Sequence, residues 1–141
     1  AAESSFNTKW SGFDSAIKRG EAATVTFSEE EITSRGARYL RDSGVQAKAV
    51  QINLCSGKGK GQAAMGLELM GQQVAVVVEG HLDLVATTPR IVVDSLQVGA
   101  VPEQIGTLAA NQVLQAANVQ VPKEIREVTT TTKEATLKGQ R

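Results

Sequence analysis

The chain of 141 residues has the size of one domain, in which about two thirds of the unfolded surface can be buried. Its 15 acidic and 15 basic residues balance, which leaves no overall field to attract nucleic acid, so we expect no nucleic-acid partner. No stretch approaches the roughly 20 apolar residues that cross a bilayer, and the single Cys55 excludes an internal disulfide.

An amphipathic helix is predicted at the start of the chain. The apolar residues Phe6, Trp10, Phe13 and Ile17 are spaced by four, three and four positions, which places them on one helical face. We expect this stripe to anchor the helix to the rest of the protein, with a membrane or partner contact as the alternative. We therefore expect the chain to divide into an N-terminal helix over 1–20 and a single α+β domain over 21–141.

A second helix is predicted to begin at Ser28, directly after a short β-branched segment over 23–27. Ser28 and Glu31 have the spacing of a capping box, in which each side chain bonds the backbone N–H of the other residue. The acidic residues 29–31 are interpreted as a helix start and nothing more. Gly44 is expected to end the helix, whose buried face comprises Ile32, Gly36, Tyr39 and Leu40.

From residue 50 the apolar period changes from about 3.6 to 2, which is typical of consecutive strands. Alternating segments cover 50–55, 65–70 and 74–84, with a tight turn at Gly71-Gln72. Thr87-Thr88-Pro89 is expected to break the pairing before a fourth strand over 91–98. The pattern therefore predicts an antiparallel meander, and its third strand, at about 12 residues, is longer than the usual five or six.

The last third of the chain predicts a helix followed by more β-structure. Pro102 is expected to open an amphipathic helix that runs through about Ala117. Threonine-rich segments over 128–132 and 135–139 favour a final strand or hairpin, because β-branched residues suit a pleated surface. The fold class is therefore α+β.

We find no catalytic centre. His81 shares one strand face with Glu79 and Asp83, which could hold a metal or move a proton, but such a row is also typical of a solvated strand face. No second His or Cys completes a transition-metal shell, and Cys55 is interpreted as an idle thiol. We therefore expect no enzyme, no metal and no cofactor.

A glycine-lysine segment, Gly57-Lys58-Gly59-Lys60-Gly61, resembles a phosphate-binding loop only at first sight. It lacks the Walker spacing and joins two strands, whereas a Walker loop joins a strand to a helix. We expect a flexible hairpin tip that is a plain solvated turn, with contact between an anionic head group and Lys58 and Lys60 as the alternative.

The aliphatic strand faces suit either a packed core or the lining of an apolar groove, and their pattern does not separate the two. The candidate ligand-binding residues share an inward position on a strand or helix. They are Val50, Ile52, Leu54, Met65, Leu67, Leu69, Val74, Val76, Val78, Leu82, Ile105, Leu108 and Val113.

The element order resembles that of a known family. Thr24 to Leu40 reads as a short strand entering a capped helix, and long strands end in Asp94-Ser95-Leu96-Gln97-Val98-Gly99-Ala100-Val101-Pro102 before a helix and a terminal strand. Over residues 22 to 140 this is similar to the LmeA-like bacterial cell-envelope family, related to the tubular lipid-binding (TULIP, BPI-like) superfamily. The resemblance implies a curved antiparallel sheet of about 5–6 long strands wrapped on a long amphipathic helix, with the N-terminal helix added.

The leading hypothesis is non-enzymatic binding of a lipid or other aliphatic ligand in an apolar groove. The resemblance implies an extracytoplasmic location, in the periplasm or cell envelope, with the cytoplasm as the alternative, and allows a peripheral membrane contact. The alternative function is a structural or adaptor domain that acts through protein contacts, for example as a homodimer through the N-terminal helix. An enzyme is the third hypothesis and would depend on His81.

Overall fold

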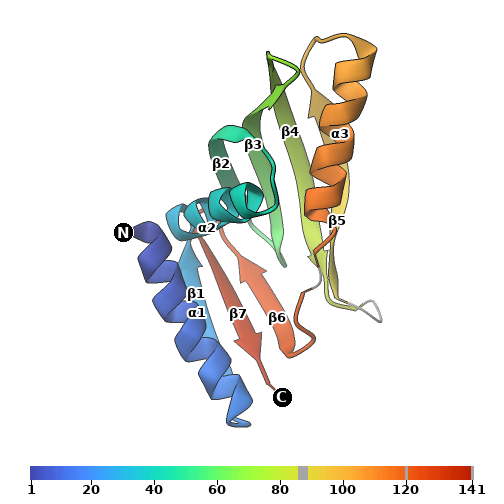
Figure 1. Ribbon diagram of the computed structural model, residues 1–141. Helices are drawn as coiled ribbons and strands as arrows, with labels where there is room; N and C mark the ends of the chain where they lie inside the picture. Colours follow the sequence, from blue (N-terminus) through green and yellow to red (C-terminus); the bar gives the residue numbers. More distant parts are fainter. Residues whose placement is uncertain (86–88, 120, 141) are drawn as a thin grey trace.

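The computed structural model describes residues 1–85, 89–119 and 121–140 and has an α+β fold (Figure 1). Three helices and seven strands lie in these ranges. The helices are α1 (Ala2–Lys18), α2 (Glu29–Asp42) and α3 (Glu103–Ala117). The strands are β1 (Ala23–Ser28), β2 (Ala47–Cys55), β3 (Lys60–Leu69), β4 (Gln72–Asp83), β5 (Arg90–Val98), β6 (Ile125–Thr130) and β7 (Glu134–Gly139). Residues 87 and 88 of the expected break before β5 lie outside the described ranges.

The strands form two antiparallel sheets, so the expectation of a single sheet of 5–6 strands was wrong. The four-stranded sheet has the order β2-β3-β4-β5, which is the meander that the alternation predicted. The three-stranded sheet has the order β1-β7-β6, so the first strand pairs with the last. Figure 1 shows the two sheets with α2 at the place where they meet. Alternation along a strand reports its two faces but not its partner, and for this reason it did not reveal the division.

Helix α2 begins as predicted. Ser28 is its N-cap: the Ser28 side chain accepts from the backbone N–H of Glu31, and the Glu31 side chain accepts from the backbone N–H of Ser28. The helix ends at Asp42, and Gly44 follows in the left-handed region with φ 80°. Glycine has no Cβ to clash in this conformation, which explains why the chain turns here into β2.

The aromatic stripe of α1 faces the protein interior. Phe6 stacks on Phe27 of β1 with ring centroids 4.4 Å apart, and Trp10 contacts Phe13 at 5.7 Å. Phe13 and Ile17 are buried. These side chains therefore anchor α1 to the three-stranded sheet, as expected.

Two hydrophobic clusters stabilise the molecule. The larger cluster joins α3 to the four-stranded sheet. Its buried residues are Val45, Leu67, Leu69, Val74, Val76, Ile105, Ala109 and Val113. The smaller joins α1 to β6 and contains Phe13, Ile17, Ile125 and Val128. The buried members of the two clusters are therefore distinct, with one group packed against α3 and the other against α1.

Two local predictions need correction. The turn between β3 and β4 consists of Met70 and Gly71, both with positive φ (51° and 77°), whereas Gln72 already belongs to β4. Two successive positive φ values are typical of the hairpin turn that matches strand twist. Pro102 is the N-cap of α3 and not its first helical residue.

Candidate functional site: an apolar groove between the two sheets

Two adjoining cavities of about 370 and 490 Å³ form an apolar groove in the middle of the molecule. They share seven wall residues, and each of these comes from a different element: Phe6 of α1, Ile32 of α2, Ile52 of β2, Ala63 of β3, Val78 of β4, Ile91 of β5 and Ala117 of α3. We call the larger space the α2 cavity and the smaller one the hairpin cavity. Ile91 is 38% exposed, so the groove wall reaches the surface at β5.

The groove exists because small residues stand where the two packed clusters meet. Ala63 and Ala117 line both cavities, Gly36 lines the α2 cavity, and Gly61 and Gly80 line the hairpin cavity. Large side chains at these positions would fill the space to the density of an ordinary protein interior. The close approach of Gly80 to the carbonyl oxygen of Val92, 2.6 Å from where a Cβ would lie, leaves no room for a side chain there.

Helix α2 is held against the groove by hydrogen bonds to β2. The Thr33 hydroxyl accepts from the backbone N–H of Ile52 and donates to the carbonyl oxygen of Ile52, both at 3.1 Å. Glu29 accepts from the backbone N–H of Leu54 at 2.9 Å. Because β2 is an edge strand of its sheet, these side chains occupy backbone groups that would otherwise lack partners.

The α2 cavity is also bounded by a bond between two helices. The Tyr39 hydroxyl of α2 donates to the carbonyl oxygen of Ala116 in α3 at 2.9 Å. Both residues line this cavity. Tyr39 thus connects the helix beside the edge strand to the helix over the sheet at the wall of the groove.

The hairpin cavity ends at the glycine-lysine segment, which is docked on the neighbouring sheet. Gly57 and Thr130 exchange two backbone hydrogen bonds of 2.9 and 2.8 Å. The Thr130 hydroxyl donates to the carbonyl oxygen of Cys55 and accepts from the backbone N–H of Gly59. Our interpretation of a flexible tip was therefore wrong: the backbone of this hairpin is part of the junction between the sheets.

The predicted groove residues divide between the cavity walls and the packed core. Wall positions are occupied by Val50, Ile52, Leu54, Met65, Val78, Leu82 and Val113. Leu67, Leu69, Val74, Val76 and Ile105 are instead buried in the larger cluster, and Val113 belongs to both groups. Leu108 lies on the outer side of α3, where it is 43% exposed. All of these positions are apolar and periodic, so the sequence had no signal that separates wall from core.

The two lysines proposed for head-group contact are both exposed, but only one borders the groove. Lys60 lines the hairpin cavity at the first residue of β3. Lys58 lies in the turn between Gly57 and Gly59. An amphiphile in the hairpin cavity would thus have an ammonium group within the cavity wall.

The polar row around His81 has a partner on β5. The imidazole Nδ1 of His81 lies 2.8 Å from Asp94 Oδ2, at a bulge in the pairing of β4 with β5. Both side chains are about 40% exposed, which limits the electrostatic strength of the pair. Across the described ranges, no group of three or more His, Cys, Asp or Glu side chains is arranged to hold a metal ion. Cys55 is a half-buried free thiol.

Sequence reasoning missed a charged side chain in the wall of the α2 cavity. Arg35 lines this cavity, and its Nη1 is buried without a hydrogen-bond partner in the part of the chain that the structure describes. The signal was available: Ile32, Arg35, Gly36, Tyr39 and Leu40 follow the spacing of a single helix face, and all of them line the α2 cavity. The sequence prediction named this face without its arginine.

Glu31 is a buried carboxylate that links α1 to α2. It accepts from Lys9 Nζ at 2.8 Å and from the Ser5 hydroxyl, in addition to the backbone of Ser28. Burial raises the pKa of Glu31, but the hydrogen bonds from Lys9, Ser28 and Ser5 outweigh it and lower the pKa to about 2. The carboxylate is therefore ionised at neutral pH and fixes the position of α1, which supplies Phe6 to the groove.

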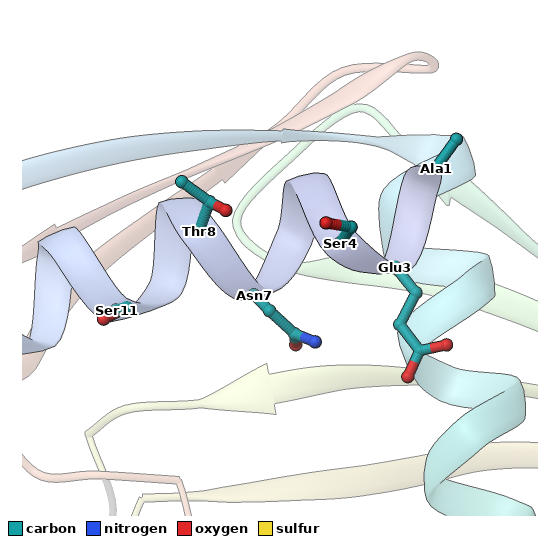
Figure 2. Close-up of a pocket in the computed structure, with 6 residues that line it drawn as sticks. All are labelled: Ala1, Glu3, Ser4, Asn7, Thr8 and Ser11. Carbon is teal, nitrogen blue, oxygen red and sulfur yellow. The ribbon is translucent and has the colours of Figure 1, made fainter.

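A separate depression of about 590 Å³ lies on the outer face of α1. Figure 2 shows its lining side chains, and all of them are on α1 or at its N-cap, Ala1. They are Ala1, Glu3, Ser4, Asn7, Thr8 and Ser11. A hollow bounded by a single polar helix face offers a ligand no converging groups, so we place the candidate site in the apolar groove.

No family model, no curated protein and no solved structure matches this chain. Among the described residues, no helix has the length and apolar character needed to span a membrane.

Proposed function

We propose that the protein binds a lipid or a similar aliphatic ligand in the apolar groove, without catalysing a reaction, in the bacterial cell envelope. One observation carries this proposal: the two adjoining cavities have almost entirely apolar walls, and seven different elements contribute the residues that line both. Each volume falls in or near the range of roughly 300–1,000 Å³ that is typical of small-molecule sites.

The shape of the groove favours an elongated ligand. The two cavities adjoin and have seven lining residues in common, so together they offer an aliphatic chain a longer apolar surface than either does alone. Burial of apolar ligand surface contributes about 25 cal/mol per Å², and this supplies affinity without requiring many polar contacts. A relationship to the tubular lipid-binding superfamily, which the order of the elements along the chain suggested, is part of this proposal.

Trp10 provides a direct test, because it is the only tryptophan and lines the hairpin cavity. Bromine atoms on an acyl chain quench an indole that they contact. We expect methyl dibromostearate, added below its aggregation threshold, to quench Trp10 fluorescence saturably, and unbrominated methyl stearate to reverse the quenching by competition. Native mass spectrometry should find one ligand per chain.

Two filled-groove variants and one matched control locate the binding. Ala63→Phe places a large ring in a wall shared by both cavities. Ala117→Leu adds a smaller side chain to another shared wall position. Both should weaken binding by about tenfold or more, because the ligand and the new side chain compete for the same volume. Ala64→Phe inserts the same ring at the next position of β3, on the opposite face of the sheet, and should leave the affinity unchanged.

Absence of saturable quenching by the wild-type protein, together with no co-purifying lipid, would overturn the proposal. Equal loss of binding in Ala64→Phe would also contradict it, because the effect would then not come from the groove. The structural or adaptor alternative predicts this negative result and would be pursued by measuring the oligomeric state in analytical ultracentrifugation.

A further inference from the structure

Arg35 is in an unusual place for a charged residue. It lies on the inward face of α2 among the apolar walls of the α2 cavity, and its Nη1 is buried with no hydrogen-bond partner in the ranges that the structure describes. Among the described residues, the ion pairs of α2 are made by Glu31, Arg38 and Asp42, and none of them includes Arg35. A guanidinium keeps its charge at any physiological pH, so deprotonation does not relieve the cost of burial.

We propose that Arg35 binds the carboxylate of a long-chain fatty acid whose aliphatic chain occupies the groove. This inference rests on the proposed function and names the ligand class. A buried donor without a partner costs free energy in the ligand-free protein, and a carboxylate would remove that cost by accepting hydrogen bonds in the bidentate geometry that guanidinium offers. The remaining walls are apolar and suit the chain.

The charge balance favours a carboxylate over a phosphate ester. Arg35 is the only cationic side chain lining the α2 cavity, among the residues for which the structure gives positions. A carboxylate carries one negative charge, whereas a phosphate monoester carries about 1.5 to 2 at neutral pH. One guanidinium therefore neutralises the carboxylate and leaves excess negative charge on the phosphate, in surroundings that penalise an unpaired charge.

Lys60 borders the other cavity and is the competing anchor. It is exposed, so water and salt screen its charge, whereas Nη1 of Arg35 is withdrawn from solvent. An ion pair at Arg35 is thus expected to determine the affinity, and one at Lys60 to contribute little.

The test compares three ligands that share one type of chain: dibromostearic acid, its neutral methyl ester, and stearyl phosphate as a competitor. Arg35→Met keeps an unbranched apolar stem and removes the charge. It should weaken binding of the acid by about tenfold or more and leave binding of the methyl ester within about twofold. Arg41→Met, at an exposed position on the same helix, is the control and should leave the affinity for the acid nearly unchanged. Lys60→Met tests the competing anchor in the wall of the hairpin cavity.

A second readout concerns the ligand-free protein. Since Nη1 of Arg35 is buried without a hydrogen-bond partner among the described residues, Arg35→Met should raise the melting temperature while it lowers the affinity for the acid. A residue kept only for stability would show a lower melting temperature.

The outcomes separate this inference from the proposed function. If the wild-type protein binds acid and ester equally and Arg35→Met changes neither, the Arg35 assignment is wrong while groove binding stands. Stronger competition by stearyl phosphate than by stearic acid would overturn the carboxylate assignment, and loss of acid binding in Lys60→Met alone would move the anchor to β3. If neither ligand binds the wild type, the groove function itself fails.

Discussion

Glu31 has two structural roles, of which the local sequence indicates only the first. Its capping-box bond to Ser28 follows from spacing alone. The contacts with Lys9 and Ser5 come from α1, more than 20 positions earlier, and depend on how the two helices pack. Our interpretation of the acidic triplet as a helix start and nothing more was therefore too narrow, also because Glu29 bonds the edge of β2.

Glu31→Gln is expected to destabilise the protein by about 1–3 kcal/mol at neutral pH, because it removes a charged acceptor from three donors. The folded-state pKa of about 2 lies below the ordinary 4.5, so the carboxylate contributes stability that is fully present above about pH 4.5. This contribution is lost as the pH falls from 4.5 towards 2. Urea denaturation between neutral pH and pH 2 measures it as the difference between wild type and variant.

Glu30→Gln is the matched control, since this neighbouring carboxylate is exposed. It should change the free energy of unfolding by less than about 0.5 kcal/mol. A wild-type advantage over Glu31→Gln that stays constant down to pH 2 would contradict the assigned pKa.

At the scale of elements, α2 protects a sheet edge and forms a groove wall at the same time. Thr33 and Glu29 occupy backbone groups of β2, while the adjacent face of the helix presents Ile32, Arg35 and Gly36 to the cavity. The helix and its cap were predictable from local spacing. Its pairing with β2 was not, because side-chain to backbone bonds between elements leave no periodic signal.

Thr33→Val keeps the branched shape but removes the hydroxyl that both donates to and accepts from Ile52. We expect a loss of about 1–3 kcal/mol in the free energy of unfolding, because the N–H and C=O of Ile52 lose their partner on the edge of the sheet. Chemical denaturation provides the value, and hydrogen exchange at the Ile52 amide should become faster.

Ser34→Ala changes the next residue of α2, whose hydroxyl makes none of the side-chain hydrogen bonds found in the described ranges. Alanine has the better helix propensity, so this control should be neutral or slightly stabilising. Equal destabilisation by both substitutions would mean that the effect arises from the helix itself and not from its contact with β2.

At the scale of the whole molecule, two sheets with separate hydrophobic clusters meet at the hairpin between β2 and β3. The Gly57–Thr130 bridge and the Thr130 hydroxyl connect this hairpin to β6. Thr130 is a buried polar residue, 4% exposed, in a stretch of four consecutive threonines. The residues beside it in this stretch are also threonines, so only the packing distinguishes Thr130 from them.

Thr130→Val should reduce the free energy of unfolding by about 1–2 kcal/mol, because the carbonyl of Cys55 and the N–H of Gly59 lose their shared partner. Hydrogen exchange at Gly59 should accelerate. Thr129→Val, at the exposed neighbouring position of β6, should stay within about 0.5 kcal/mol of the wild type. A Thr130→Val variant as stable as Thr129→Val would refute the role of this side chain at the junction.

The sequence by itself determined the elements of this protein: the α1 stripe, the Ser28 cap, the meander over β2 to β5, α3 and the final hairpin. These features depend on spacings within one segment, where period and capping act locally. The tertiary structure decided how the strands divide into two sheets and which apolar residues line a cavity. Leu67 and Met65 have the same period on the same strand, yet the first is fully buried and the second borders the groove. It also decided that Nη1 of Arg35, a residue that lines the cavity, is buried with no hydrogen-bond partner among the described residues, because burial depends on neighbours that are distant in the sequence.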